Sequence, residues 1–120
     1  MNNLFDIACN FSSDRFDSDL NEVIQRAKDN KVTKFLIVSA SLEDTKKVNN
    51  IYEDNKDSCF FTIGVHPHNA KEFNSSSSLK MKHLIEEYRP HSVGETGLDF
   101  FRNISTYEEQ LFAFEQQIQI

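Results

Sequence analysis

The sequence predicts an α/β chain built on a parallel sheet, and two observations support that prediction. Four short apolar runs alternate along the chain with segments in which apolar residues recur at helical spacing. Each strand and helix together take roughly 30 residues, the usual length of such a unit. Alternation of this kind indicates parallel strands, because parallel neighbours need a long crossover connection.

The first half of the sequence contains two predicted strands, each followed by a helix. Residues 4–9 form the first strand, and the helical apolar positions after it are Phe16, Leu20, Val23, Ile24 and Ala27. Residues 34–39 form a continuous apolar run, typical of a parallel strand that is covered on both faces. The segment Ser41-Leu42-Glu43-Asp44 has the form of a capping box, and the helix after it should direct Val48, Ile51 and Tyr52 inward.

The second half repeats this order twice. Residues 60–65 form the third predicted strand, and the serine run 75–78 is expected to be a short solvated linker. A helix with inward positions Met81, Leu84, Ile85 and Tyr88 follows, and Pro90 ends it. Residues 91–95 form the fourth strand. Ser105 or Thr106, each with Glu three residues later, should cap a last helix that carries Leu111, Phe112, Phe114 and Ile118.

Length and composition limit the classes of function. The chain has 120 residues, enough for one domain with a core. Its formal net charge of −6 argues against a broad basic surface that would hold duplex nucleic acid. A phosphate substrate stays open, because a bound divalent cation can reverse the local field.

The same composition favours an intracellular protein. Cys9 and Cys59 fit no CxxC pattern, and two isolated thiols are typical of a reducing compartment. The N-terminus lacks a basic region followed by an apolar one, and no apolar run approaches the roughly 18 residues of a membrane span. We therefore expect a cytoplasmic protein, with the nucleus as the alternative in a eukaryote.

Two segments at predicted strand ends carry the residues with chemistry. Gly64-Val65-His66-Pro67-His68 ends the third strand, and Gly94-Glu95-Thr96-Gly97-Leu98-Asp99-Phe100 ends the fourth. Ligands of α/β folds collect at the carboxyl ends of the strands. The two segments therefore predict one shared site. No dinucleotide-binding, P-loop, nucleophile-elbow or zinc-ribbon motif occurs elsewhere in the sequence.

Glu95 is the metal candidate of this site, because small neighbours let the backbone approach a ligand and a carboxylate binds hard cations. A solvated or ion-paired loop glutamate is the alternative. His66 and His68 can each present an imidazole to a metal-bound water or to a substrate phosphate. Their alternative is structural, with His66 packed in the core and His68 exposed.

Two further residues could bind substrate at these strand ends. Arg102 could grip a phosphate in bidentate fashion, although an Asp99–Arg102 ion pair that shapes the loop is an equally good interpretation. Asn10, after the first strand, could contribute an amide ligand or a hydrogen bond. His83 and His91 lie on a helix face and before a strand, so we assign both to structure.

The chain resembles the TatD family of metal-dependent deoxyribonucleases, a branch of the metallo-dependent hydrolase superfamily. Phe5-Asp6-Ile7-Ala8-Cys9-Asn10-Phe11 looks like the family's first strand, and the two segments ending the third and fourth strands look like its N-terminal signatures. The resemblance covers the whole chain, in order. It implies a TIM-type (β/α)8 barrel, of which residues 1–120 would be the first four βα units, the N-terminal part of a single barrel domain.

The resemblance also implies a reaction, a cofactor and residue roles. The reaction is hydrolysis of DNA phosphodiester bonds by metal-activated water, as in a 3′–5′ exodeoxyribonuclease, with Mg²⁺ as the expected metal and Mn²⁺ or Zn²⁺ as alternatives. Glu95 would be a metal ligand, and His66 and His68 would act beside it. Asn10, Asp99 and Arg102 are the predicted substrate-binding residues. Many members carry a histidine pair on the first strand, where this chain has Ala8 and Asn10. We therefore do not expect those two residues to bind metal.

The later ligands of the family, two histidines and an aspartate, have no counterpart in this sequence. We therefore expect residues 1–120 to be a fragment without a complete metal site, inactive as a nuclease by itself. Two alternatives stay open: a superfamily hydrolase acting on C–N or ester bonds, and a non-catalytic half-barrel whose open strand edges favour self-association. DNA is the expected substrate, with no membrane and no stable protein partner implied.

Overall fold

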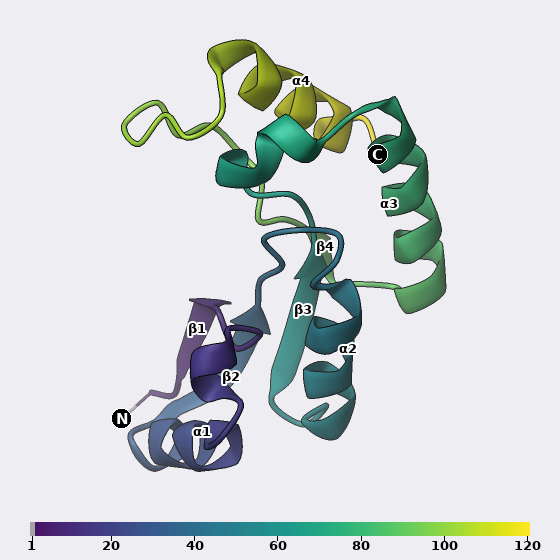
Figure 1. Ribbon diagram of the computed structural model, residues 1–120. Helices are drawn as coiled ribbons and strands as arrows, with labels where there is room; N and C mark the ends of the chain where they lie inside the picture. Colours follow the sequence, from purple (N-terminus) through teal and green to yellow (C-terminus); the bar gives the residue numbers. More distant parts are fainter. Residues whose placement is uncertain (1) are drawn as a thin grey trace.

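The computed structural model describes residues 2–120 and contains a curled four-stranded parallel sheet with helices between the strands (Figure 1). The strands are β1 (Leu4–Cys9), β2 (Val32–Ile37), β3 (Cys59–Ile63) and β4 (Ser92–Val93). They lie side by side in chain order, and each neighbouring pair is parallel. The predicted alternation of strands and helices is confirmed.

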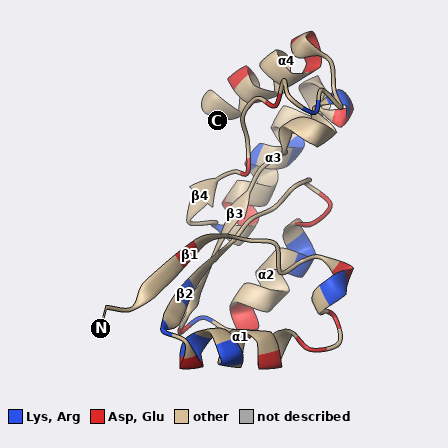
Figure 2. Ribbon diagram, turned by 90° about the vertical axis from the view of Figure 1, so that its left-hand side faces the viewer, with Lys and Arg blue, Asp and Glu red and all other residues tan. Residues whose placement is uncertain are grey.

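The helices follow the strands in the predicted order. They are α1 (Leu20–Asp29), α2 (Thr45–Asp54), α3 (Ser75–Tyr88) and α4 (Tyr107–Ile118), with 3₁₀ turns η1 (Asp14–Phe16) before α1 and η2 (Pro67–Glu72) before α3. Figure 2 shows that acidic and basic residues are interspersed along the chain, most clearly along α1. None of the helices formed by residues 2–120 combines the length and apolar character needed to cross a membrane.

The hydrophobic core lies between the sheet and its helices. Alternate residues of the two central strands point to this side and are at most 1% exposed: Phe35, Ile37, Phe61 and Ile63. They form one cluster with Ile24 of α1, Val48 of α2 and Met81 of α3. Burial of each such side chain stabilises the fold by about 1.5–3 kcal/mol. Leu36 and Val38 point to the other face and are only partly buried. The second strand was predicted to be buried on both faces, and the structure buries it fully on one face only.

The serine run 75–78 is not a linker, and that prediction is wrong. These residues form the first turn of α3, which Asn74 caps. The Asn74 side chain accepts hydrogen bonds from the backbone N–H groups of Ser76 (2.9 Å) and Ser77 (3.3 Å), and the Ser77 hydroxyl accepts one from the Asn74 N–H (3.0 Å). Ser and Asn side chains form hydrogen bonds with the free N–H groups at the start of a helix. The Asn74 cap therefore makes the serine run 75–78 helical.

The capping box predicted from Ser41 is also absent, because α2 begins only at Thr45. Asp44 is the N-cap residue and makes no side-chain cap. Its carboxylate instead accepts hydrogen bonds from the backbone N–H groups of Ala40 (3.3 Å) and Ser41 (3.2 Å). The acidic residue therefore shapes the loop after β2.

The last helix is capped as predicted but buries an unexpected face. Thr106, one of the two predicted caps, forms a capping box with Glu109. Two of its apolar residues, Phe112 and Ile118, are 39% and 65% exposed, whereas Gln110 and Gln117 are 1% and 3% exposed. The glutamines lie inside because their amides bond to loop backbone, as the site geometry shows.

The strand boundaries differ from the predicted ones by a few residues, and the fourth strand differs most. β4 contains two residues, Ser92 and Val93, of the five predicted. The chain then turns across the strand ends, where the Gly94 N–H donates to the Ile63 carbonyl (2.9 Å) and the Glu95 N–H donates to the Ser39 carbonyl (3.0 Å). This turn brings Glu95 over the end of β2.

His91 packs in the structure, as expected, and the two cysteines are buried. The His91 ring meets the rings of Tyr52, Phe60 and Phe61 edge-on, and its Nδ1 accepts the Phe61 N–H (3.3 Å). Cys9 and Cys59 are free thiols that are 4% and 1% exposed. Burial raises the pKa of both thiols, so neither is an activated nucleophile.

Candidate functional site

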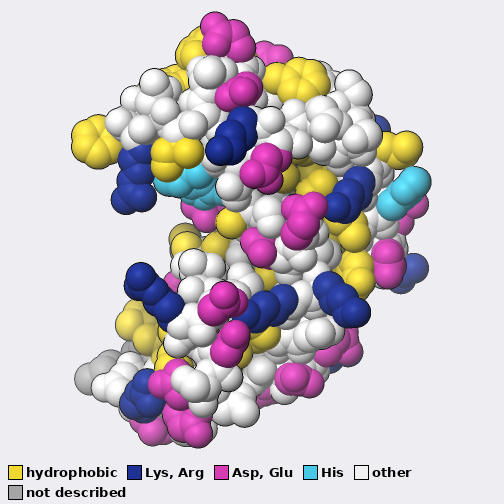
Figure 3. All heavy atoms as spheres, in the orientation of Figure 1, with side chains coloured by type: hydrophobic (Ala, Val, Ile, Leu, Met, Phe, Trp, Pro, Cys, Tyr) yellow, Lys and Arg dark blue, Asp and Glu magenta, His cyan; other side chains and the backbone are white. Residues whose placement is uncertain are grey.

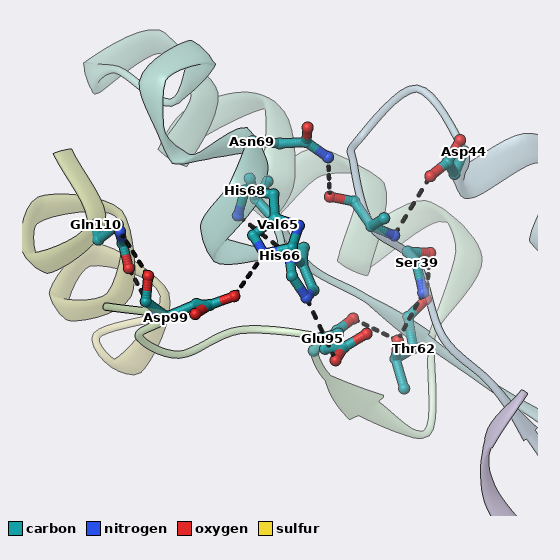
Figure 4. A network of polar contacts seen from close by, with 12 residues as sticks. Ser39, Asp44, Thr62, Val65, His66, His68, Asn69, Glu95, Asp99 and Gln110 are labelled. Carbon is teal, nitrogen blue, oxygen red and sulfur yellow. Dashed lines mark hydrogen bonds and ion pairs between the residues drawn. The ribbon is translucent and has the colours of Figure 1, made fainter. Parts of the chain in front are cut away.

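Most of the predicted site residues line one cavity at the carboxyl ends of the strands, and Figure 4 shows His66, His68, Glu95 and Asp99 of this region. The cavity measures about 460 Å³ and is lined by Ala8, Asn10, Val38, Ala40, His66, His68, Asn69, Glu95 and Arg102. Figure 3 shows a deep hollow in this face, with histidine at its upper wall and Lys or Arg at its rim. Five of the six predicted site residues therefore line one space, and the sixth, Asp99, contacts His68.

His66 is held by one hydrogen bond from its backbone and one to its ring. Its N–H donates to the Ala40 carbonyl (2.9 Å), and its Nδ1 accepts the His68 N–H (3.1 Å) as the N-cap of η2. Pro67 occupies the first position of η2, where its missing N–H costs nothing. An accepting Nδ1 places the proton of the neutral ring on Nε2, which lies 3.6 Å from Glu95 Oε1.

The electrostatics of His66 favour its neutral form. Burial lowers the pKa of His66 below its ordinary value of 6.5, and the nearby Glu95 carboxylate opposes this shift. His68 is a further group that lowers the pKa of His66. A neutral ring with its proton on Nε2 is a hydrogen-bond donor toward the cavity, which suits a water or a phosphate oxygen better than a metal ion.

His68 and Asp99 form a close pair. His68 Nε2 lies 2.5 Å from Asp99 Oδ2, and the two side chains are 24% and 25% exposed. Asp99 Oδ1 accepts the backbone N–H groups of Phe101 (3.1 Å) and Arg102 (3.0 Å). The Arg102 N–H first, and then the His68 ring, hold the pKa of Asp99 below its usual 3.8. The carboxylate therefore stays charged and orients the His68 ring.

The Asp99–Arg102 ion pair considered from the sequence is absent among the described residues. Asp99 meets only the backbone of Arg102, and its side chain is engaged by His68. The Arg102 guanidinium makes no ion pair with any carboxylate of residues 2–120. A cation without a protein partner beside a cavity is a site for an anionic group.

Glu95 rests on a tight junction between strand ends. A Cβ on Gly64 would lie 2.6 Å from Gly94 Cα, so only glycine lets the two segments approach this closely. Beneath Glu95, the Thr62 hydroxyl donates to the Gly94 carbonyl and accepts the Ser39 N–H (3.2 Å), while the Ser39 hydroxyl donates to the Thr62 carbonyl (2.8 Å). These buried bonds join the ends of β2, β3 and β4 and support Glu95, whose side chain is 46% exposed.

Two buried glutamines of α4 hold the loops that carry the histidine pair and Asp99. The Gln117 side chain accepts the Val65 N–H (2.8 Å) and donates to the Val65 carbonyl (3.1 Å), one residue before His66. The Gln110 side chain accepts the Asp99 N–H (2.7 Å) and donates to the Asp99 carbonyl (3.2 Å). The sequence prediction missed both residues. The sequence pattern that could have indicated them is a pair of glutamines seven positions apart, which places both on one face of a helix.

Asn69 is another site residue that the sequence prediction missed. It lines the cavity, and its side-chain amide donates to the Ala40 carbonyl (2.9 Å), joining η2 to the loop after β2. The side chain of Asn10 is exposed at the cavity wall, and no residue of the described chain is its hydrogen-bond partner. Asn10 is therefore accessible to a ligand.

The donor set fits part of a metal site. Within residues 2–120 no three His, Cys, Asp or Glu side chains converge as a metal-binding group. Glu95 alone provides an accessible carboxylate on the cavity, with the Nε2 donor of His66 beside it. Mg²⁺ commonly keeps several waters and binds one or two carboxylates together with substrate phosphates. Glu95 fits one ligand of such a cation, and the described residues do not form a closed cage.

Sequence comparisons find one family and many relatives. The family model described as TatD related DNase matches residues 5–120. The chain is 36% identical over 115 residues to the 3'-5' ssDNA/RNA exonuclease TatD of Pantoea ananatis, covering 96% of this chain and 44% of that protein. It is 38% identical over 117 residues to the protein of the same name from Cronobacter sakazakii, covering 98% of this chain and 44% of that one.

Solved structures show the same relationship. A TatD homologue from Escherichia coli superposes with a TM-score of 0.86 at 25% identity, covering 97% of this chain and 45% of that chain. A TatD family hydrolase from Entamoeba histolytica gives a TM-score of 0.81 at 28% identity, covering 98% and 45%. The likeness confirms the predicted fold class, the first four βα units of a TIM-type barrel. The chain spans less than half the length of the relatives and structures that it matches.

Proposed function

The chain belongs to the TatD related DNase family, and on that basis we propose that it supplies the N-terminal half of a metal-dependent nuclease site. The reaction is hydrolysis of DNA phosphodiester bonds from the 3′ end of a single strand. The observation that carries the proposal is the meeting of His66, His68, Glu95 and Arg102 at one cavity, with no ion-pair partner for Arg102 among residues 2–120. The names of the bacterial relatives, 3'-5' ssDNA/RNA exonucleases, support the choice of substrate.

Each residue has a distinct task in this proposal. Arg102 binds a non-bridging phosphate oxygen through its planar guanidinium. Neutral His66 donates from Nε2 to a phosphate oxygen or a water in the cavity. Asn10, which also lines the cavity, contributes an amide hydrogen bond to the substrate. These contacts place the scissile phosphate beside Glu95.

His68 and Asp99 handle a proton in this proposal. Asp99 fixes the His68 ring by accepting at Oδ2, 2.5 Å from Nε2. Nδ1 of His68 has no hydrogen-bond partner among residues 2–120 and lies in a side chain that lines the cavity. It can therefore exchange a proton with the attacking water or with the leaving oxygen.

Glu95 is the residue that would hold a divalent cation, Mg²⁺ in the first place and Mn²⁺ or Zn²⁺ as alternatives. Such a cation would lower the pKa of water at the site and offset the negative charge of the phosphate. The described donors make only part of a coordination shell. We therefore propose that residues 1–120 bind nucleic acid but do not hydrolyse it.

Binding and hydrolysis are tested separately. Fluorescence anisotropy of a labelled single-stranded oligonucleotide, measured in EDTA, should show binding that weakens in Arg102→Gln. Incubation of the purified chain with Mg²⁺ should leave the oligonucleotide at full length. Metal-dependent shortening that disappears in Glu95→Gln would overturn the expected inactivity and extend the nuclease assignment to residues 1–120.

One outcome would overturn the nuclease proposal itself. If the chain binds no oligonucleotide and instead promotes metal-dependent hydrolysis of a small cyclic amide, the site belongs to the C–N branch of the superfamily. The matched control in both assays is Lys82→Gln, because Lys82 is an exposed cation on α3 and does not line the cavity.

The two thiols support a proposal on cellular location. We propose a cytoplasmic protein, or a nuclear one in a eukaryote, because Cys9 and Cys59 are buried free thiols of the kind that a reducing compartment maintains. Fractionation of cells that express the tagged chain tests this, and recovery from a secretory or periplasmic fraction would contradict it.

A further inference from the structure

The loop between β4 and α4 exposes an aromatic ring that packing does not explain. Phe101 is 97% exposed, the highest value among the large exposed hydrophobic residues of the described chain. Its neighbours Leu98, Phe100 and Ile104 are 43–52% exposed, so the loop as a whole presents apolar surface. Contiguous exposed apolar surface marks interaction sites, so this loop is a candidate binding surface.

Hydrogen bonds hold this loop in one shape. Asp99 Oδ1 accepts the N–H groups of Phe101 and Arg102, and the Asn103 N–H donates to the Asp99 carbonyl (3.3 Å). Gln110, 1% exposed, binds both backbone groups of Asp99 from α4. The outward position of Phe101 is therefore imposed by its neighbours and is not the result of a loose loop.

A stacked aromatic pair supports the base of the loop. The rings of Phe100 and Tyr107 lie 5.2 Å apart between centroids, with an interplanar angle of 28°. Tyr107 is the first residue of α4, so this stack joins the loop to the helix. Phe101 follows directly and is left without an aromatic partner among residues 2–120.

Charge near Phe101 complements a phosphate. Arg102 is adjacent in sequence, lines the cavity and makes no ion pair within residues 2–120. This guanidinium supplies positive charge at the cavity of a chain whose net charge is −6. Figure 3 shows hydrophobic atoms and a Lys or Arg side chain together at the rim of the hollow, near the histidine.

We propose that Phe101 stacks on an unpaired nucleobase whose adjoining phosphate is bound by Arg102. An aromatic face beside an arginine is the usual platform for single-stranded nucleic acid, because every base has a π-face and every nucleotide a phosphate. A base inside a duplex is stacked on its neighbours and cannot use the platform. Phe101 therefore selects single strands or frayed ends. This inference rests on the proposed nuclease function.

The chain offers a direct optical test because it contains no tryptophan. Phe101→Trp introduces a single indole at the stacking position. We expect an oligodeoxythymidine, added in EDTA to prevent hydrolysis, to quench the fluorescence of Phe101→Trp. An abasic strand of the same length should not quench it. Ile118→Trp is the matched control, since Ile118 is 65% exposed on α4 and lies away from the loop.

Affinity gives a second readout. Phe101→Ala should weaken oligodeoxythymidine binding by about 5- to 150-fold, the usual effect of losing one stacked base, while the binding of the abasic strand stays unchanged. The thermal unfolding midpoint should equal that of the unaltered chain, because an exposed side chain contributes little to the core.

The outcomes separate the two ideas. If the unaltered chain binds oligodeoxythymidine but Phe101→Trp is not quenched and Phe101→Ala binds normally, the stacking proposal is wrong and the nuclease proposal stands. If the unaltered chain binds no strand, both proposals fail. Equal quenching by the abasic strand would also overturn stacking, since the signal would then come from the backbone.

Discussion

Replacing Gln117 with methionine should destabilise the fold, because the backbone N–H and carbonyl of Val65 would lose their hydrogen-bond partner. The Gln117 amide is 3% exposed and binds both the N–H and the carbonyl of Val65, at 2.8 Å and 3.1 Å. Val65 is itself 6% exposed. Methionine has a similar length and volume but cannot hydrogen-bond in this way, so both groups would lose their partner.

The size of the effect follows from those two groups. A buried backbone donor or acceptor without a partner costs about 1–3 kcal/mol, and burial of the more apolar methionine offsets part of the sum. We expect a net loss of about 2–4 kcal/mol in the free energy of unfolding. For a domain of this size that loss corresponds to a fall in Tm on the order of 10 °C.

Urea unfolding followed by circular dichroism measures this loss, and hydrogen exchange at the Val65 amide locates it. Gln119→Met is the matched control, because Gln119 is the exposed C-cap residue of α4 and should change stability by less than about 0.5 kcal/mol. Equal midpoints for Gln117→Met and Gln119→Met, with slow exchange at Val65 in both, would refute the role of Gln117.

Three further predictions concern other parts of the molecule. Gly64→Ala should prevent folding or lower stability by about 1–3 kcal/mol or more, since the new Cβ would lie 2.6 Å from Gly94 Cα; a normal midpoint in urea would contradict it. The lowered pKa of Asp99 stabilises the fold above its usual pKa of 3.8, and this contribution is lost as the pH falls through the lower folded value. Thermal melts should therefore show Asp99→Asn less stable than the unaltered chain near neutral pH, with the difference shrinking as acid is added. Cys9 and Cys59, whose pKa values burial raises, should react with a thiol reagent only slowly until denaturant is added; fast labelling of the native chain would count against their burial.

The placement of the site could be predicted because it depends on topology. His66, His68 and Glu95 follow two apolar runs, and the carboxyl ends of neighbouring parallel strands meet at one edge of the sheet. Their proximity therefore follows from strand periodicity and connection length, both of which can be read locally. The same reasoning placed Arg102 at the cavity, since it lies in the loop after the fourth strand.

The hydrogen-bond partners could not be predicted in this way. Asp99 had a sequence neighbour of opposite charge in Arg102, yet its side chain bonds to His68, 31 positions earlier. Gln110 and Gln117 of α4 were not among the predicted site residues. Their burial depends on loop backbone, and for Gln117 that backbone is 52 positions away at Val65.

The sequence by itself determined the four βα units, the parallel order and the strand ends at which chemistry collects, because hydrophobic periodicity and chain connectivity are local properties. Only the tertiary structure decided which polar groups meet. It turned Asp99 toward His68, left Arg102 unpaired, placed Gln110 and Gln117 inside and exposed Phe101 at the rim. The physical reason is that a buried polar group must find a partner wherever the fold places one, and that position depends on packing among distant segments.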